Sequence, residues 1–132
     1  MDIKIVSATL FLLVLLYFYL SAKVALFRYK YRIEHGHDNT PKFKKSVRAQ
    51  ANFGEYTPLI LLELFILSTL NANSMLLGIL SCMIIIGRIF HAYGLITLEL
   101  RNPAVYWGRS AGIMLTFVCM IGSAISILFY AF

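Results

Sequence analysis

Apolar residues in this chain fall into four long runs, which polar stretches of unequal length separate. The runs cover roughly residues 5–22, 53–70, 75–95 and 111–132. A helix that crosses a bilayer needs about 20 mostly apolar residues, and each run is close to that length. None of them alternates apolar and polar residues as a membrane β-strand does, so we expect helices, which satisfy their own backbone polar groups. The pattern predicts an all-α integral membrane protein, a bundle of four transmembrane helices.

Composition supports this class. Of the 132 residues, 60% are hydrophobic and 14% are charged, whereas soluble domains are about 45–50% apolar and about 25% charged. The first run is longer than the apolar core of a signal peptide, and basic residues follow it, so we expect it to be retained. The length suits a single domain, residues 1–132. Cys82 and Cys119 both lie inside apolar runs and are expected to be buried and unpaired.

Basic residues concentrate in two of the three connections between the runs. The short polar turn at residues 71–74 carries none and predicts a hairpin between the second and third spans. The first connection is rich in lysine and arginine, and the third, roughly residues 96–110, carries Arg101 and Arg109. The positive-inside rule then places these two connections in the cytoplasm and both termini on the opposite side. The net charge of +6 therefore indicates topology rather than nucleic-acid binding, since no nucleic-acid module is visible.

Polar residues gather at the predicted cytoplasmic ends of all four spans. Arg48, Asn52 and Glu55 stand at i, i+4 and i+7, which is one stripe of a helix. The other spans add, in chain order, Arg28, Arg88, His91, Arg109 and Ser110. Ionisable residues within spans usually face the bundle interior or a wet cavity and mark a functional site.

Two interpretations of this layer remain open. Glu55 and Arg88 are expected to form an ion pair between the second and third spans, which is a structural role. The arginines of the layer nevertheless outnumber the nearby acids, Glu55 and Glu63. Surplus guanidiniums favour an anionic ligand, because their forked donors match carboxylates. Headgroup contacts together with structural pairs are the other explanation. Glu63 lies two turns deeper than Glu55, and its expected surroundings are either Arg88 or the floor of a cavity.

Glycines in the last two spans suit close contacts between helices. Gly108 and Gly112 form a small-xxx-small pair, and Gly87 and Gly94 give the third span a smooth side. Small residues of this kind allow close contact between membrane helices.

Three motifs in this layer resemble the MAPEG family, the membrane-associated proteins in eicosanoid and glutathione metabolism. They read RAQANFGE at 48–55, GRIFHAYG at 87–94 and GRSAG at 108–112. The resemblance covers nearly the whole chain, and the short bacterial, YecN-like branch is the most similar. It implies a homotrimer of four-helix bundles in the bacterial inner membrane. Glutathione is expected between subunits, near the cytoplasmic ends of the helices.

The same resemblance assigns roles to residues. It implies that glutathione is bound by Arg28, Arg48, Asn52, Glu55, Arg88 and His91. Lys23 is a rival to Arg28 as the first-helix ligand. Arg109 is expected to stabilise the glutathione thiolate, which is the nucleophile, and Ser110 to donate a hydrogen bond to it. These two residues form the expected catalytic pair.

Departures from the family pattern narrow the expected function. Leu95 and Ile113 stand where eicosanoid-forming relatives carry tyrosines, which argues against an eicosanoid synthase. No metal is expected, because His35 and His37 in the first connection have no third ligand nearby.

The sequence therefore predicts a glutathione-dependent membrane transferase or peroxidase acting on lipophilic electrophiles. Its expected partners are further copies of itself, glutathione as co-substrate, a lipophilic substrate and membrane lipid. One alternative is a non-catalytic lipid- or thiol-binding membrane protein of the same fold. Another is a small transporter or channel subunit, which would need the polar stripe to continue beyond Glu63.

Overall fold

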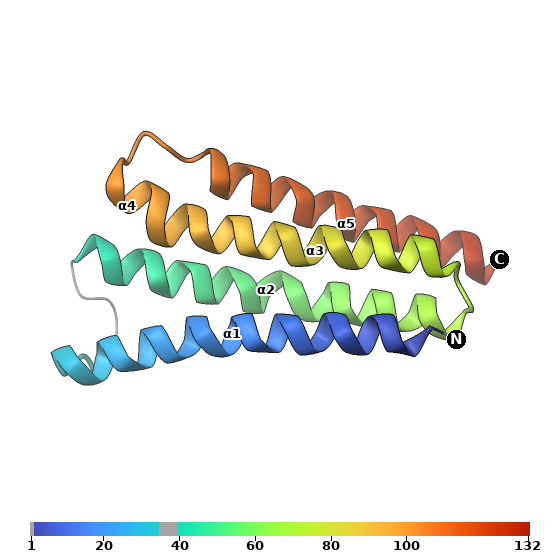
Figure 1. Cartoon of the computed structure of the whole chain (residues 1–132), viewed down its shortest axis with the longest axis horizontal. Coiled ribbons are helices and arrows are strands. Elements are labelled where there is room, and N and C mark those ends of the chain that lie inside the picture. Colours follow the sequence, from blue (N-terminus) through green and yellow to red (C-terminus); the bar gives the residue numbers. More distant parts are fainter. Residues whose placement is uncertain (1, 35–39) are drawn as a thin grey trace.

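Four long antiparallel helices make up the computed structural model, which describes residues 2–34 and 40–132 (Figure 1). They are α1 (Ile3–Tyr31), α2 (Pro41–Thr69), α3 (Ser74–Tyr93) and α5 (Trp107–Ala131). A π-helical turn, η1 (Gly94–Leu98), and the short α4 (Glu99–Arg101) continue α3 without a break. The predicted all-helical bundle is confirmed. We call the end where α1 and α4 finish and α2 and α5 begin the polar end; both termini lie at the opposite end (Figure 1).

The helices extend well beyond the apolar runs. α1 continues to Tyr31, α2 begins at Pro41, and the last connection shrinks from the expected 96–110 to residues 102–106. Hydropathy marks only the part of a helix that apolar surroundings cover. Polar helix ends keep their backbone hydrogen bonds, and their long basic side chains reach towards water. Pro41 also favours an early start to α2, because proline is suited to the first helical position.

Three helices are long and apolar enough to cross a membrane: α1, the continuous stretch Ser74–Arg101, and α5. The chain is therefore an integral membrane protein. α2, which contains the expected span at 53–70, does not meet this measure, since its first half is polar and Glu63 interrupts the second. It runs beside the other three over their length (Figure 1), and its crossing of the membrane stays a prediction.

The turn between α2 and α3 confirms the predicted hairpin. α2 ends in a Schellman motif, in which Ala72 N–H donates to Leu67 O and Asn71 N–H to Ser68 O. Asn71 takes the required left-handed conformation at φ 55°. Asn73 then caps α3 by accepting from Met75 N–H at 2.8 Å. Four residues thus reverse the chain and satisfy the exposed helix ends.

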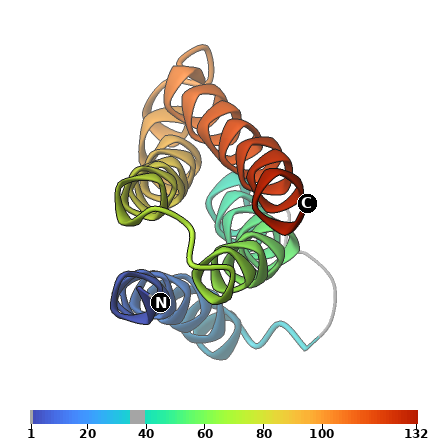
Figure 2. The same cartoon turned by 90° about the vertical axis from the view of Figure 1, so that its right-hand side faces the viewer.

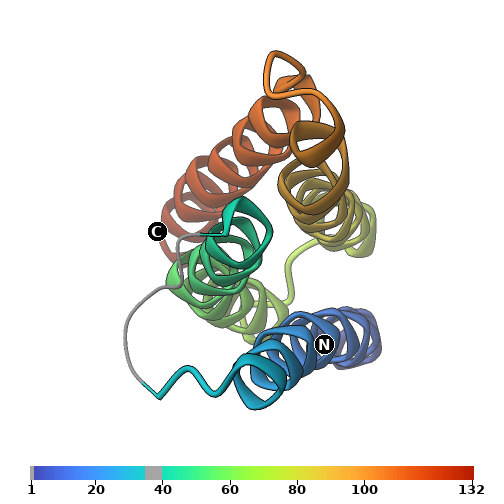
Figure 3. The same ribbon diagram turned by 90° about the vertical axis from the view of Figure 1, so that its left-hand side faces the viewer.

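Helix α2, which carries several of the predicted site residues, contacts each of the other long helices. Figures 2 and 3, which look along the bundle, show α3 beside α5 and α2 beside α1. The fully buried apolar side chains between them include Leu13, Leu20, Ile60, Leu64, Leu77 and Ile84. Asn52 and Glu63 of α2 find partners on α3 and α5, whereas the buried Ser46 and Ser68 bond to the backbone of α2 itself.

Helices α3 and α5 meet through their glycines, as the sequence predicts. A Cβ atom on Gly112 would lie 2.4 Å from His91 N and 2.6 Å from Gly87 O. A Cβ atom on Gly94 would lie 2.3 Å from Arg109 N. Both clashes would be with backbone, which cannot rotate away. The close approach fixes the start of α5 against the end of α3.

We expect Gly112→Ala to lower thermal stability strongly, because the added methyl group has no room between the two backbones. Overpacked sites typically lose about 1–3 kcal/mol. Gly78→Ala on α3 is the matched control, since nothing lies within 4 Å of its Cβ position. Melting in detergent measures both variants. Equal melting temperatures for the two would contradict the close contact.

Candidate functional site at the polar end

The innermost part of the site is a buried guanidinium. Arg88, on α3, is 1% exposed. One terminal nitrogen donates to Asn52 Oδ1 on α2 at 2.8 Å, and the other contacts Thr116 Oγ1 on α5 at 3.4 Å. The guanidinium also lies over the Phe53 ring, 5.4 Å from its centre. Arg88 therefore joins three helices, but every polar partner it has there is uncharged.

His91, one turn further along α3, belongs to the same buried layer. It is 4% exposed, and its Nδ1 has no hydrogen-bond partner among the described residues. Arg88, Arg109 and Arg48 all act on it electrostatically, so positive charge from three helices reaches one imidazole. The structure thus brings together these predicted site residues from α2, α3 and α5.

An outer layer of the site is exposed on the surface of the single chain. Arg48 Nη1 and Glu55 Oε1 lie 3.8 Å apart on α2, with side chains 66% and 48% exposed. The expected ion pair between Glu55 and Arg88 is wrong. Glu55 is exposed on α2 and pairs with Arg48, about two turns earlier on the same helix, whereas Arg88 is turned inward to Asn52.

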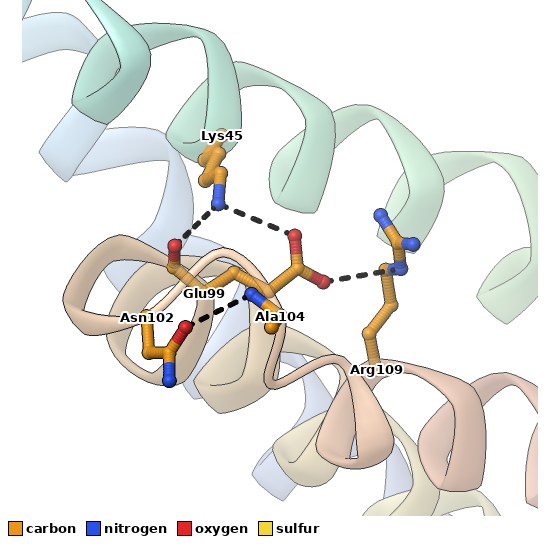
Figure 4. Close-up of polar contacts among 5 residues, drawn as sticks. All are labelled: Lys45, Glu99, Asn102, Ala104 and Arg109. Carbon is orange, nitrogen blue, oxygen red and sulfur yellow. Dashed lines mark hydrogen bonds and ion pairs between the residues drawn. The ribbon is translucent and has the colours of Figure 1, made fainter.

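Arg109 and Ser110 open α5 beside this layer, and both are exposed. Arg109 Nε forms an ion pair with Glu99 Oε1 at 3.2 Å (Figure 4). The other oxygen of Glu99 lies 3.3 Å from Lys45 Nζ on α2. The start of α5 is thus connected by charge to α4 and α2.

The first-helix candidates lie apart from this group. Arg28 covers the Phe43 ring at 5.3 Å, and Lys23 lies over Tyr19 at 5.8 Å. Both contacts are with the aromatic side chains of α1 and of the start of α2. Among the described residues, these ring contacts lie outside the group of Arg88, His91 and Arg109.

The deeper polar residues have different partners from those expected. Ser123 on α5 donates to Glu63 across the α2–α5 contact, at 2.5 Å. No ion pair between Glu63 and Arg88 occurs among the described residues. Cys119 is buried, as predicted, and contacts Leu80 O at 3.3 Å. Cys82 was expected to be buried but is exposed, because it points away from the bundle on α3.

The sequence analysis missed three members of the site: Lys45, Glu99 and Thr116. Thr116 follows Gly112 by one turn and donates to its carbonyl at 2.8 Å, so helical spacing from the glycine motif would have placed it. Glu99 was counted as part of a loop. The surplus of arginines over acids is smaller than expected, because Glu99 neutralises one of them.

The outer layer thus presents two exposed cations, Arg48 and Arg109, and one exposed carboxylate, Glu55. Exposed Arg48 and Arg109 can receive carboxylates or a thiolate, and exposed Glu55 can receive an ammonium group. Among residues 2–34 and 40–132, no group of three or more His, Cys, Asp or Glu side chains is placed to hold a metal ion. His35 and His37 lie outside the described residues.

No curated protein matches the chain significantly. The profile of the MAPEG family, however, matches residues 6–129. That range covers most of α1 and α5, all of α2 and α3, and every residue assigned to the site. The chain therefore belongs to the MAPEG family.

Proposed function

We propose that the protein is a glutathione-dependent membrane transferase or peroxidase that acts on lipophilic electrophiles. The MAPEG family includes glutathione transferases and peroxidases. Glutathione carries two carboxylates, one ammonium group and one thiol. The polar end offers separate groups of matching charge for each of these.

The observation that carries the proposal is the buried charge of Arg88. Its side chain is almost inaccessible, yet no carboxylate lies within ion-pair distance among the described residues. A buried charge without a counter-charge is strongly unfavourable. An anion bound beside Asn52 and His91 would compensate it.

The two layers suggest a division of roles. Arg48, Glu55 and Arg109 are exposed and would contact the tripeptide directly. Arg88 and His91 are buried beneath this exposed layer and would act on the bound tripeptide through their charge and dipole. Asn52 lies between the two layers. The deprotonated thiol beside Arg109 would then attack an electrophile that arrives through the bilayer.

The chemistry balances without a metal. In conjugation, the thiolate forms a C–S bond with the electrophile and expels its leaving group, while the thiol proton passes to solvent. In peroxide reduction, two molecules of glutathione become the disulfide, and the hydroperoxide becomes an alcohol and water. Ser110, the residue after Arg109, would donate a hydrogen bond to the thiolate.

We further propose that the working form is a homotrimer whose polar ends face the cytoplasm. The Arg48–Glu55 pair lies open on α2, and Arg28 covers the Phe43 ring near the start of the same helix. An interface between copies would cover the former. It would also let Arg28 or Lys23 of a neighbouring copy complete the site.

One observation favours a second candidate, a non-catalytic lipid- or thiol-binding protein. Leu95 is buried and carries no hydroxyl, so the tyrosine that assists chemistry in some relatives has no equivalent there. Thiolate stabilisation then rests on Arg109 and Ser110. Binding without turnover would identify this second function.

The proposal predicts that glutathione binds to the detergent-purified trimer and reacts with a chloro-nitro aromatic compound. Calorimetry measures the binding, light scattering the trimer, and absorbance the conjugate. Ophthalmic acid, in which a methyl group replaces the thiol, is the control and should bind without reacting. Absence of any heat of binding, or a protein that stays monomeric at every concentration, would contradict the proposal.

A further inference from the structure

Glu99 lies at the meeting point of three helical segments of the polar end. Its Oε2 is 3.3 Å from Lys45 Nζ, and its Oε1 is 3.2 Å from Arg109 Nε. Lys45 also donates to the backbone oxygen of Glu99 at 2.8 Å. Figure 4 shows the carboxylate between the two cations, with Lys45 reaching down from α2 and Arg109 rising from α5.

Local structure fixes Glu99 in this position. The π-helical turn η1 ends just before it, and the bond from Glu99 N–H to Gly94 O closes that turn. Insertion of a wider turn changes the direction of the residues that follow, and such turns are frequent at functional sites. Gly94 packs directly on the backbone of Arg109. The same glycine therefore sets the position of both Glu99 and the residue it contacts.

Burial differs sharply between the partners. The side chain of Glu99 is 8% exposed and that of Arg109 is 45% exposed. Glu99 is thus the fixed member, held twice by Lys45, and Arg109 is the mobile one. The ion pair with Nε acts at the end of the side chain, next to the guanidinium carbon, and so restrains the position of the guanidinium itself.

The contact uses only one edge of the guanidinium. Glu99 Oε1 lies 3.2 Å from Nε and forms an ion pair with it but accepts no hydrogen bond among the described residues, while the two terminal nitrogens of Arg109 point away from it (Figure 4). No hydrogen bond or ion pair engages those nitrogens within the described parts of the chain. Two cations share one carboxylate, so a positive charge remains. The terminal donors are free to receive an anion.

We infer that Glu99 is a positioning residue, which holds Arg109 by its Nε edge so that its terminal nitrogens face the thiolate. The inference rests on the proposed function. Preorganised donors stabilise a developing charge without reorganisation during the reaction. Lys45 supports this role by fixing the carboxylate.

The variant Glu99→Gln tests the role, because two explanations predict opposite changes in the thiolate fraction of bound glutathione. If Glu99 were only a counter-charge, its removal would strengthen the field of Arg109, and bound glutathione would carry more thiolate. If Glu99 positions Arg109, its removal lets the guanidinium move, and bound glutathione carries less thiolate. Glutamine has the size of glutamate, so the packing around residue 99 is preserved.

We expect Glu99→Gln to lower kcat about 10-fold, with little change in KM for glutathione, since a small misplacement of a reacting group has an effect of this order or larger. The pH titration of the thiolate absorbance should move to higher pH. Lys45→Met should act in the same direction with a smaller effect. Glu34 is an exposed acid at the same end, so Glu34→Gln is the matched control. It should leave kcat and the thiolate titration unchanged. If the thiolate titration of Glu99→Gln were unchanged, or moved to lower pH, the inference would be overturned.

A second measurement does not depend on glutathione. Phenylglyoxal modifies accessible guanidiniums, and mass spectrometry of the peptides reports the rate at Arg109 in parent and Glu99→Gln protein. We expect faster modification of Arg109 in the variant, with Arg101 unchanged as an internal reference. If the parent binds no glutathione, the proposed function fails, but this rate still shows whether Glu99 restrains Arg109. Equal rates would overturn the inference itself.

Discussion

Replacing Arg109 with alanine should reduce turnover about 100- to 1000-fold, which is the usual effect of removing one preorganised donor from a developing anion. Arg109 is the exposed cation at the start of α5, and it is anchored to Glu99 at 3.2 Å. Without it, the bound thiol should lose its thiolate absorbance at neutral pH. Binding of the tripeptide, measured by calorimetry, should weaken far less, because Arg48 and Glu55 remain.

Two further variants separate charge from geometry at this position. Arg109→Lys keeps a cation but not the forked donors, and we expect it to recover only part of the lost turnover. Arg101→Ala removes an exposed cation of the same polar end and should behave as the parent protein. Parental turnover in Arg109→Ala at neutral pH would exclude a role for this residue in the chemistry.

Helix packing was largely predictable from the sequence because it depends on small residues at fixed spacing. The glycines of GRIFHAYG and GRSAG face each other between α3 and α5, with room for no side chain at Gly94 or Gly112. The hairpin at residues 71–74 was predictable for a similar reason, since the polar NANS turn separates two apolar runs. Both features follow from local rules that require no knowledge of distant contacts.

Side-chain partners were less predictable, because a helical stripe gives the direction of a residue but not its depth. Glu55 and Asn52 are close in sequence, yet Glu55 is exposed with Arg48 and Asn52 is buried with Arg88. The expected Glu55–Arg88 pair assigned the charge of Arg88 to the wrong neighbour. An amide, rather than a carboxylate, occupies the inner position.

Glu99 was missed because the helix does not stop where the hydrophobicity does. The residues after Gly94 have a mixed pattern, and the π-helical turn breaks the 3.6-residue period by which a helix is recognised. A connection of roughly 96–110 was expected, so Glu99 had no predicted direction. The structure places it 3.2 Å from the residue expected to do the chemistry.

The buried Asn52–Arg88 contact gives the sharpest test of whether the polar end binds a ligand. Changing either residue alone should destabilise the bundle by about 1.5–3 kcal/mol, because the partner is left buried without its hydrogen bond. The double variant Asn52→Leu/Arg88→Met removes both polar groups. It should recover most of the stability of the parent, since paired apolar replacements of buried polar groups are often nearly neutral. Melting of the four proteins completes a double-mutant cycle.

Glutathione binding by the stable double variant then separates the two interpretations. If Asn52 and Arg88 serve the ligand, the variant should fold and form trimers but bind glutathione about 10- to 150-fold more weakly, the equivalent of about 1.5–3 kcal/mol. Gln50→Leu is the matched control, because this α2 amide bonds to Ser21 on α1 instead of to α3, and it should bind as the parent does. A double variant that regains stability and binds glutathione as tightly as the parent would show that the Asn52–Arg88 contact only holds α2 to α3. The uncompensated charge of Arg88 would then have no connection with an anionic ligand.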